Sequence, residues 1–131
     1  MPTFRVGAEY TRSRDFPTIR LLAVRCYVNT QRAGHLFLVN PGAPQTILHP
    51  WLIRLYGLED KPQVLDELAV QPSPYHPVSG RQAHVTFETL DWDQRAIRVD
   101  GLLGMNWFAG YTVVSLHMPV DGEPFLELTS S

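Results

Sequence analysis

Hydrophobic residues occur along this chain in short runs that are separated by proline, glycine and asparagine. The run 18–28 is rich in β-branched residues and partly alternates, which predicts a strand. Turn-forming residues fill 29–34, and the apolar run 35–39 predicts a second strand, buried on both faces and paired with the first as a hairpin. Residues 45–48 predict another short extended segment.

Two short helices are predicted between the strands. Pro50 suits the first turn of a helix over 51–56, and Gly57 suits the position just after its end. Residues 105–110 have helical composition and also end in glycine. Residues 58–70 show no firm pattern, and four more runs predict strands: 82–90, 95–99, 111–117 and 125–128. Short strands at regular spacing predict a mostly β, barrel-like domain.

A weak internal repeat accompanies this pattern. A strand, a tight glycine-containing loop and a short helix occur once over 35–57 and again over 96–110. This order is typical of an architecture with two pseudo-symmetric halves.

Composition and charge narrow the classes of protein that remain. The chain has 131 residues, which favours one domain, and its net charge of −2 with scattered arginines argues against nucleic acid as a partner. Its apolar runs are too short to span a membrane, and no signal-peptide pattern opens the chain. Cys26 is the only cysteine, so no internal disulfide can form. We expect a cytoplasmic protein that does not bind membranes.

Three segments resemble a known family when they are taken in order. Residues 35–43 (HLFLVNPGA) resemble the strand that enters the catalytic loop of the retropepsin-like, or retroviral-type, aspartic proteases. Residues 47–58 are similar to the helix after that loop, and 99–108 (VDGLLGMNWF) resemble the second conserved segment of the cellular members. The resemblance implies a mostly β, retropepsin-like acid-protease barrel with two short helices. It implies one domain over 1–131, with a recognisable core over about 18–128.

The catalytic position of that family is changed here. Asn40 stands where the resemblance places the aspartate, and Pro41 stands where the family has threonine or serine, whereas Gly42 and Ala43 match. An amide has no titratable proton in the useful range, and proline offers neither a hydroxyl nor an N–H. Deamidation of Asn40 does not restore an aspartate, because its usual nucleophile is the following backbone nitrogen, which in Pro41 carries no proton. The resemblance therefore implies a pseudoenzyme with no catalytic residue.

The resemblance also implies how the domain would bind a ligand. Residues 74–80 fall where the family has a flap that closes over an extended peptide. The residues implied to contact a peptide are Asn40, Gly42, Ala43, Tyr75, His76, Val78 and Gly80. The family pattern further implies a homodimer whose chain ends share a sheet, with Thr3–Val6 and Phe125–Leu128 as the strands.

Other reactive side chains do not form a recognisable site. The five histidines are dispersed without metal-ligand spacing, so we expect neither a metal nor another cofactor. Asp91, Asp93 and Asp100 are the remaining carboxylate candidates, and Cys26 is expected to be a buried, inert thiol. Trp92 is the tryptophan most suited to a contact surface.

Two classes of function remain open from the sequence. The first is a dimeric module that binds a peptide or protein segment without cutting it. The alternative is an aspartic-type peptidase that acts through a non-standard site or by pairing with an aspartate-bearing partner.

Overall fold

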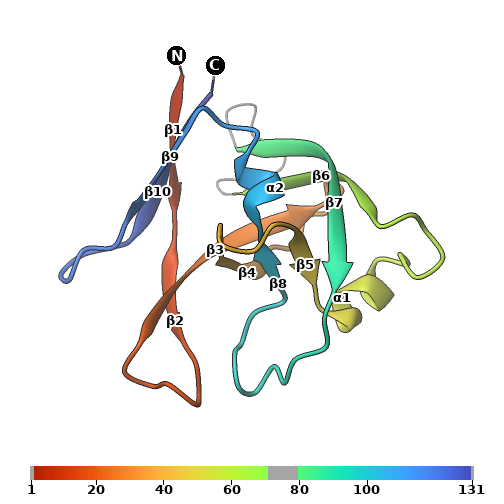
Figure 1. Cartoon of the computed structure of the whole chain (residues 1–131), viewed down its shortest axis with the longest axis horizontal. Helices are drawn as coiled ribbons and strands as arrows, with labels where there is room; N and C mark the ends of the chain where they lie inside the picture. The colour runs from red at the N-terminus through yellow and green to blue at the C-terminus, as the bar shows by residue number, and fades with distance from the viewer. Residues whose placement is uncertain (1, 71–79, 131) are drawn as a thin grey trace.

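The computed structural model describes residues 2–70 and 80–130. Six of the described strands close into a barrel, because β6 pairs with β7 on one side and returns to β3 on the other (Figure 1). The barrel strands, in spatial order, are β3 (Arg20–Val28), β4 (His35–Val39), β8 (Gly101–Leu103), β5 (Thr46–Leu48), β7 (Arg81–Thr89) and β6 (Val64–Val70). The helices are α1 (Pro50–Leu55) and α2 (Met105–Phe108). The predicted mostly β barrel with two short helices is confirmed.

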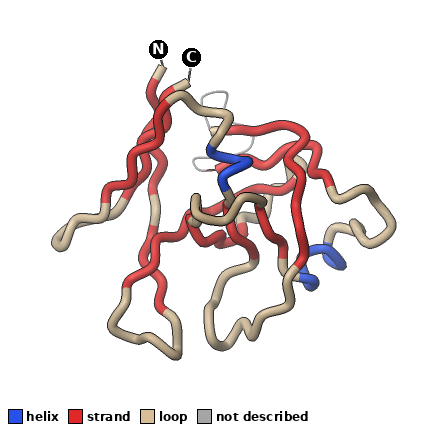
Figure 2. The backbone as a smooth tube through the Cα atoms, viewed as in Figure 1, coloured by secondary structure: helices blue, strands red, loops and turns tan. Residues whose placement is uncertain are grey.

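A separate three-stranded sheet stands beside the barrel and carries both ends of the described chain (Figure 2). It consists of β1 (Thr3–Gly7), β10 (Phe125–Thr129) and β9 (Val113–His117), in that order. Strand β2 (Glu9–Arg12) then pairs with β3 and joins this sheet to the barrel. The two terminal strands thus pair with each other within one chain, so both edges of β10 are occupied and β1 and β9 are the edges open to another chain.

Local signals explain the elements that the sequence predicts correctly. Strands β3 and β4 form the expected antiparallel hairpin. His49 caps α1 by accepting the Trp51 N–H at Nδ1 (3.2 Å), Pro50 opens the helix, and Gly57 follows it with a left-handed φ of +64°.

Two expectations about the strands are wrong, and one strand was not predicted. Residues 95–99 form no strand, because only a single bridge between Ile97 and Ser13 gives them a partner, and the strand lies further on at β8. Residues 64–70, which showed no pattern, form β6. Strand β4 is buried on one face only: Phe37 is fully buried, whereas Leu38 is partly exposed.

The interior is filled by aliphatic side chains around the buried aromatic residues Phe37, Phe87, Trp107 and Phe108. Trp107 is fully buried and donates its indole N–H to the Leu68 carbonyl (2.9 Å). Cys26 is a free thiol in this core, and burial raises its pKa well above the ordinary value, as expected for an unreactive cysteine.

Candidate functional site

The candidate site lies where two parallel strands end side by side. Strands β4 and β8 are paired so that Leu38 faces Leu102 and Val39 faces Leu103. Each strand then leads into a loop, at Asn40 and at Gly104, and the Asn40 N–H donates to the Leu103 carbonyl (3.0 Å). The two halves of the weak sequence repeat therefore meet at this point.

Residues Asn40–Ala43 form a β-turn closed by a hydrogen bond from the Ala43 N–H to the Asn40 carbonyl (3.1 Å). Pro41 occupies the second position, which its fixed φ suits, and Gly42 does not adopt a left-handed φ. An added Cβ on Gly42 would make only ordinary contact with the Asn40 Oδ1 (3.4 Å). Gly42 thus has room for a side chain, and the glycine that a close backbone approach requires is found elsewhere.

Gly104 is that glycine. A Cβ placed on it would lie 2.3 Å from the Gln45 carbonyl carbon and oxygen, far inside van der Waals contact. This approach lets the start of α2 bind the Asn40 loop: the Met105 N–H donates to the Ala43 carbonyl (2.7 Å) and the Asn106 N–H to the Pro44 carbonyl (3.2 Å). The backbone of the candidate site is therefore fixed at both ends.

Asn106 is a structural hub of the site that the sequence analysis did not identify. Its Oδ1 accepts hydrogen bonds from the Thr46 N–H (2.8 Å) and the Thr46 hydroxyl (2.9 Å). Its Nδ2 donates to the Thr86 carbonyl (2.7 Å). Thr46 is fully buried and its hydroxyl accepts the Gly104 N–H (3.2 Å), so this network joins β5, β7 and α2 behind the loop.

An apolar groove begins at the exposed face of β4. It consists of two adjoining cavities, of about 370 Å³ and about 180 Å³, which share Leu38 and Ile97. Besides these two residues, its apolar lining comes from Phe16, Ile19, Leu21, Leu90, Trp92, Ala96, Val99 and Leu102. Phe16 and Ile19 are each more than half exposed, which is unusual for large hydrophobic side chains.

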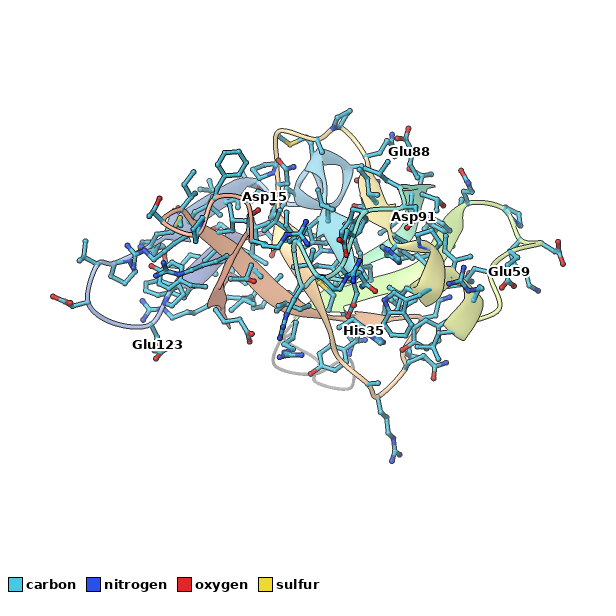
Figure 3. The ribbon with its side chains drawn as sticks, turned by 90° about the horizontal axis from the view of Figure 1, so that it is seen from below. Asp15, His35, Glu59, Glu88, Asp91 and Glu123 are labelled. Carbon is cyan, nitrogen blue, oxygen red and sulfur yellow. The ribbon has the colours of Figure 1, made fainter. Side chains whose placement is uncertain are left out.

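Two loops flank the groove, residues 13–19 on one side and residues 90–99, here called the wall loop, on the other. Figure 3 shows Asp15 and Asp91 on these separate loops. The loops touch where the Arg14 N–H donates to the Ala96 carbonyl (2.7 Å). The buried His49, which caps α1, is hydrogen-bonded through Nε2 to the Trp92 carbonyl (2.9 Å). This bond attaches the wall loop to the start of α1.

Asp100, which directly follows the wall loop, holds this end of it by hydrogen bonds. Its Oδ1 accepts hydrogen bonds from the Trp51 indole N–H and from the Gln94 Nε2, each at 3.1 Å. Its Oδ2 lies 3.4 Å from the His35 Nδ1, and the His35 Nε2 is hydrogen-bonded to the Tyr56 hydroxyl. Burial alone would raise the pKa of Asp100, but the hydrogen bonds from His35 and Trp51 outweigh it and leave the pKa below its ordinary value.

This pKa shift makes stability depend on pH. A carboxyl whose pKa is lowered by folding stabilises the protein above its unfolded pKa, near 4, and loses that contribution as the pH falls through its folded pKa. We expect Asp100→Asn to lower the free energy of unfolding by about 1 kcal/mol at pH 7, a value discounted for partial exposure, and by little at pH 3. Urea titrations at both pH values test this, with Asp60→Asn, at an exposed site, as the control. An equal loss at both pH values would contradict it.

The residues predicted to bind a peptide are only partly brought together. Asn40, Gly42 and Ala43 share the turn that follows β4, but none of them lines the groove. Gly80 is buried, and an added Cβ would lie 2.9 Å from the Tyr111 hydroxyl, so it packs against the fold instead of facing a ligand. Tyr75, His76 and Val78, and with them the predicted flap, lie outside the described residues.

The candidate carboxylates Asp91, Asp93 and Asp100 are bound to other described residues, and Asp91 pairs with His49 (3.3 Å). The Asp100 N–H bonds to the Leu36 carbonyl (2.8 Å), at the opposite end of β4 from Asn40. Asp93 accepts hydrogen bonds from the Arg95 backbone and side chain, which lower its pKa, and it also pairs with Arg14 (3.4 Å). Trp92, predicted as the tryptophan most suited to a contact surface, lines the smaller cavity and is half-buried against His49, with ring centroids 4.8 Å apart.

The fold is similar to that of a known protease. The crystal structure of a retropepsin-like aspartic protease from Rickettsia conorii matches with a TM-score of 0.57 and 15% sequence identity, over 98% of this chain and 90% of that chain. No protein-family profile matches the sequence. No curated protein matches it either. At this identity the likeness establishes a retropepsin-like fold.

Two features of the described residues concern membranes and metal ions. No described helix is both long and apolar enough to cross a membrane. No three or more described histidine, cysteine, aspartate or glutamate side chains are grouped so that they could hold a metal ion.

Proposed function

We propose that this chain is a catalytically silent, retropepsin-like module that binds an extended apolar segment of a polypeptide without cutting it, and that it acts as a homodimer. The observation that carries the proposal is the apolar groove, whose two cavities share Leu38, the residue two positions before Asn40 on β4. The groove supplies a binding surface, and Asn40, which stands where the resemblance implies an aspartate, supplies no acid.

Catalytic silence follows from the chemistry of Asn40 and Pro41. Aspartic-protease chemistry needs two carboxyls that share a proton, one acting as base toward water and the other as acid toward the amide. The amide of Asn40 cannot do either, and no described carboxylate is hydrogen-bonded to it. Pro41 removes the hydroxyl with which the family braces this loop.

The groove suits apolar side chains of an extended ligand. The smaller cavity is lined by Leu38, Leu90, Trp92, Ile97, Val99 and Leu102, with no charged side chain. Contiguous apolar surface of this kind typically marks a binding site. An extended segment presents alternate side chains to one face, so two adjoining cavities fit two such side chains.

Dimerisation is supported by the terminal sheet. Its β9 edge carries no acidic residue, lysine or arginine, and Val113 and Leu116 on it are 49% and 43% exposed. Native proteins usually protect such an edge with charge, with proline or by pairing. A second copy along this edge would pair the strand. Sedimentation that shows only monomer at micromolar concentration would remove this part of the proposal.

The binding test uses the tryptophan that lines the groove. A library of short apolar and polar peptides is titrated into the full chain while tryptophan fluorescence is recorded. We expect apolar peptides to bind with micromolar affinity, Ile97→Asp to weaken binding at least about tenfold, and Trp92→Phe to remove most of the signal. Leu55→Asp, at an exposed leucine of α1 outside the groove, is the matched control and should bind normally. Equal binding by Ile97→Asp would exclude the groove.

Catalytic silence is tested separately. The same peptides are incubated with the chain and with Asn40→Asp/Pro41→Thr from pH 3 to 8, and products are read by mass spectrometry. We expect no cleavage by the natural sequence and cleavage by the double variant. Cleavage by the natural sequence that persists in Asn40→Ala would overturn the assignment and point to the alternative of a non-standard peptidase.

A further inference from the structure

The side-chain amide and the backbone carbonyl of Asn40, which both lie beside the Asn40–Pro41 peptide bond, differ in their hydrogen bonding. The Asn40 side-chain amide makes no hydrogen bond to any described residue, and the residue is partly exposed. Its backbone carbonyl, by contrast, accepts the Ala43 N–H at 3.1 Å. The side chain is therefore free to turn, while the carbonyl beside it is polarised.

Asparagine can react with its own backbone in two ways. In the common route the next backbone nitrogen attacks the side-chain carbonyl, which leads to deamidation. Pro41 blocks this route because its nitrogen carries no proton. In the remaining route the side-chain nitrogen Nδ2 attacks the backbone carbonyl carbon of the same residue, and this route requires only a free side chain.

We propose that the folded chain cleaves its own backbone between Asn40 and Pro41 by this second route. A bond forms between Nδ2 and the Asn40 carbonyl carbon, and the bond from that carbon to the Pro41 nitrogen breaks. The proton lost from Nδ2 passes through solvent to the Pro41 nitrogen. The products are residues 1–40 ending in a five-membered cyclic imide and residues 41–131 beginning with the secondary amine of Pro41. Nothing is oxidised or reduced, and water later opens the imide.

The turn accelerates this step. Negative charge develops on the Asn40 carbonyl oxygen as Nδ2 adds, and the Ala43 N–H already points at that oxygen. A positioned backbone donor of this kind is worth up to 10²–10³ in rate in enzyme active sites, and we expect about tenfold from this single donor in a half-exposed turn. No described titratable side chain bonds to Nδ2, so hydroxide must remove its proton and the rate rises with pH.

The surrounding hydrogen bonds hold the products in place. Asn40 stays bound to Leu103, and Ala43 stays bound to Met105. The cut chain therefore remains folded, and the Pro41 amine can rejoin the imide until water opens it. Cleavage is visible only after the protein is denatured, and this self-processing does not depend on the peptide-binding function proposed above.

The full chain is kept folded for days at 37 °C, from pH 6 to 9, beside a synthetic peptide of residues 34–47. Samples are then denatured, and their masses show whether the chain is intact. We expect the folded chain to be cleaved about tenfold faster than the peptide and faster at pH 9 than at pH 6. At pH 6 we expect a 1–40 fragment one water lighter than simple hydrolysis gives, and at pH 9 this fragment should gain that water as the imide opens. A folded chain that stays intact, or that is cleaved no faster than the peptide, would overturn the proposal.

Two variants separate the mechanism from a contaminating protease. Pro41→Gly restores a backbone N–H, so we expect deamidation of an uncut chain in place of cleavage. Asn40→Gln would need a six-membered ring and is expected to stay intact. Cleavage of Asn40→Gln at the natural rate would show that the side chain of Asn40 is not the nucleophile. None of these readouts involves a peptide ligand, so a failure here leaves the binding proposal untouched.

Discussion

Replacing Gly104 by alanine is expected to lower the free energy of unfolding by at least about 3 kcal/mol. The new Cβ would lie 2.3 Å from the Gln45 carbonyl carbon and oxygen and 2.7 Å from the Thr46 nitrogen, all of them backbone atoms. Backbone cannot rotate aside as a flexible side chain would, so β5 and α2 must separate. Their separation breaks the hydrogen bonds of Met105 and Asn106 to the Asn40 loop. Urea unfolding followed by circular dichroism measures the loss.

Gly42→Ala is the matched control for this effect. Both glycines lie in the loops that follow paired strands, but the Gly42 position has room for a methyl group and no left-handed φ. We expect its free energy of unfolding to stay within about 0.5 kcal/mol of the natural protein, because alanine also reduces the entropy of the unfolded chain. Comparable destabilisation by both variants would show that the loop as a whole, not the approach at Gly104, limits stability.

Local sequence predicted the elements whose signals are themselves local. The cap, proline and glycine around α1 lie within a few residues of each other, and the helix forms where they indicate. Strand β6 gave no such signal because it pairs with two distant strands, β7 and β3. Leu68, Ala69 and Val70 are all buried in succession, which removes the alternation that marks a strand with one solvent-facing side.

The false strand over 95–99 has the opposite cause. Ala96 and Ile97 are apolar because they line the groove, not because they face a core. These apolar residues, followed by Val99, therefore imitated a strand, although only Ile97 finds a bridge partner. The same groove explains why Leu38 is partly exposed in a run that looked buried on both faces.

The candidate site was predictable only where a motif marks it. Asn40 was singled out because the segments around it resemble a known family, and in the structure it opens the turn that follows β4. Asn106 had no comparable signal, because its partners Thr46 and Thr86 lie 60 and 20 residues away in the chain. A hydrogen-bond hub of this kind is defined by tertiary structure and becomes visible only when the three segments meet.

The second large loss of unfolding free energy is expected when Asn106 is replaced. Asn106→Leu should lower the free energy of unfolding by about 3 kcal/mol, because it leaves the N–H and hydroxyl of the fully buried Thr46 without their acceptor and the Thr86 carbonyl without its donor. Gln45→Ala removes an acceptor at the exposed edge of the same network, where the Gln45 Oε1 accepts from the Thr86 hydroxyl (2.7 Å) and the Asn106 Nδ2 (3.3 Å), and it should cost less than about 1 kcal/mol. Equal losses would show that the network is not centred on Asn106.

Asn106→Asp distinguishes the two halves of the hub. An aspartate keeps an acceptor for Thr46 but, when ionised, turns negative oxygen toward the Thr86 carbonyl where Nδ2 now donates. Folding therefore raises the pKa of this carboxyl, so the variant is destabilised at pH 7 and recovers as the pH falls through that raised pKa. The difference in unfolding free energy between variant and natural protein, measured at pH 7 and pH 4, should shrink at the lower pH. A difference that is independent of pH would mean that the acceptor side alone, through Thr46, holds β5 against α2.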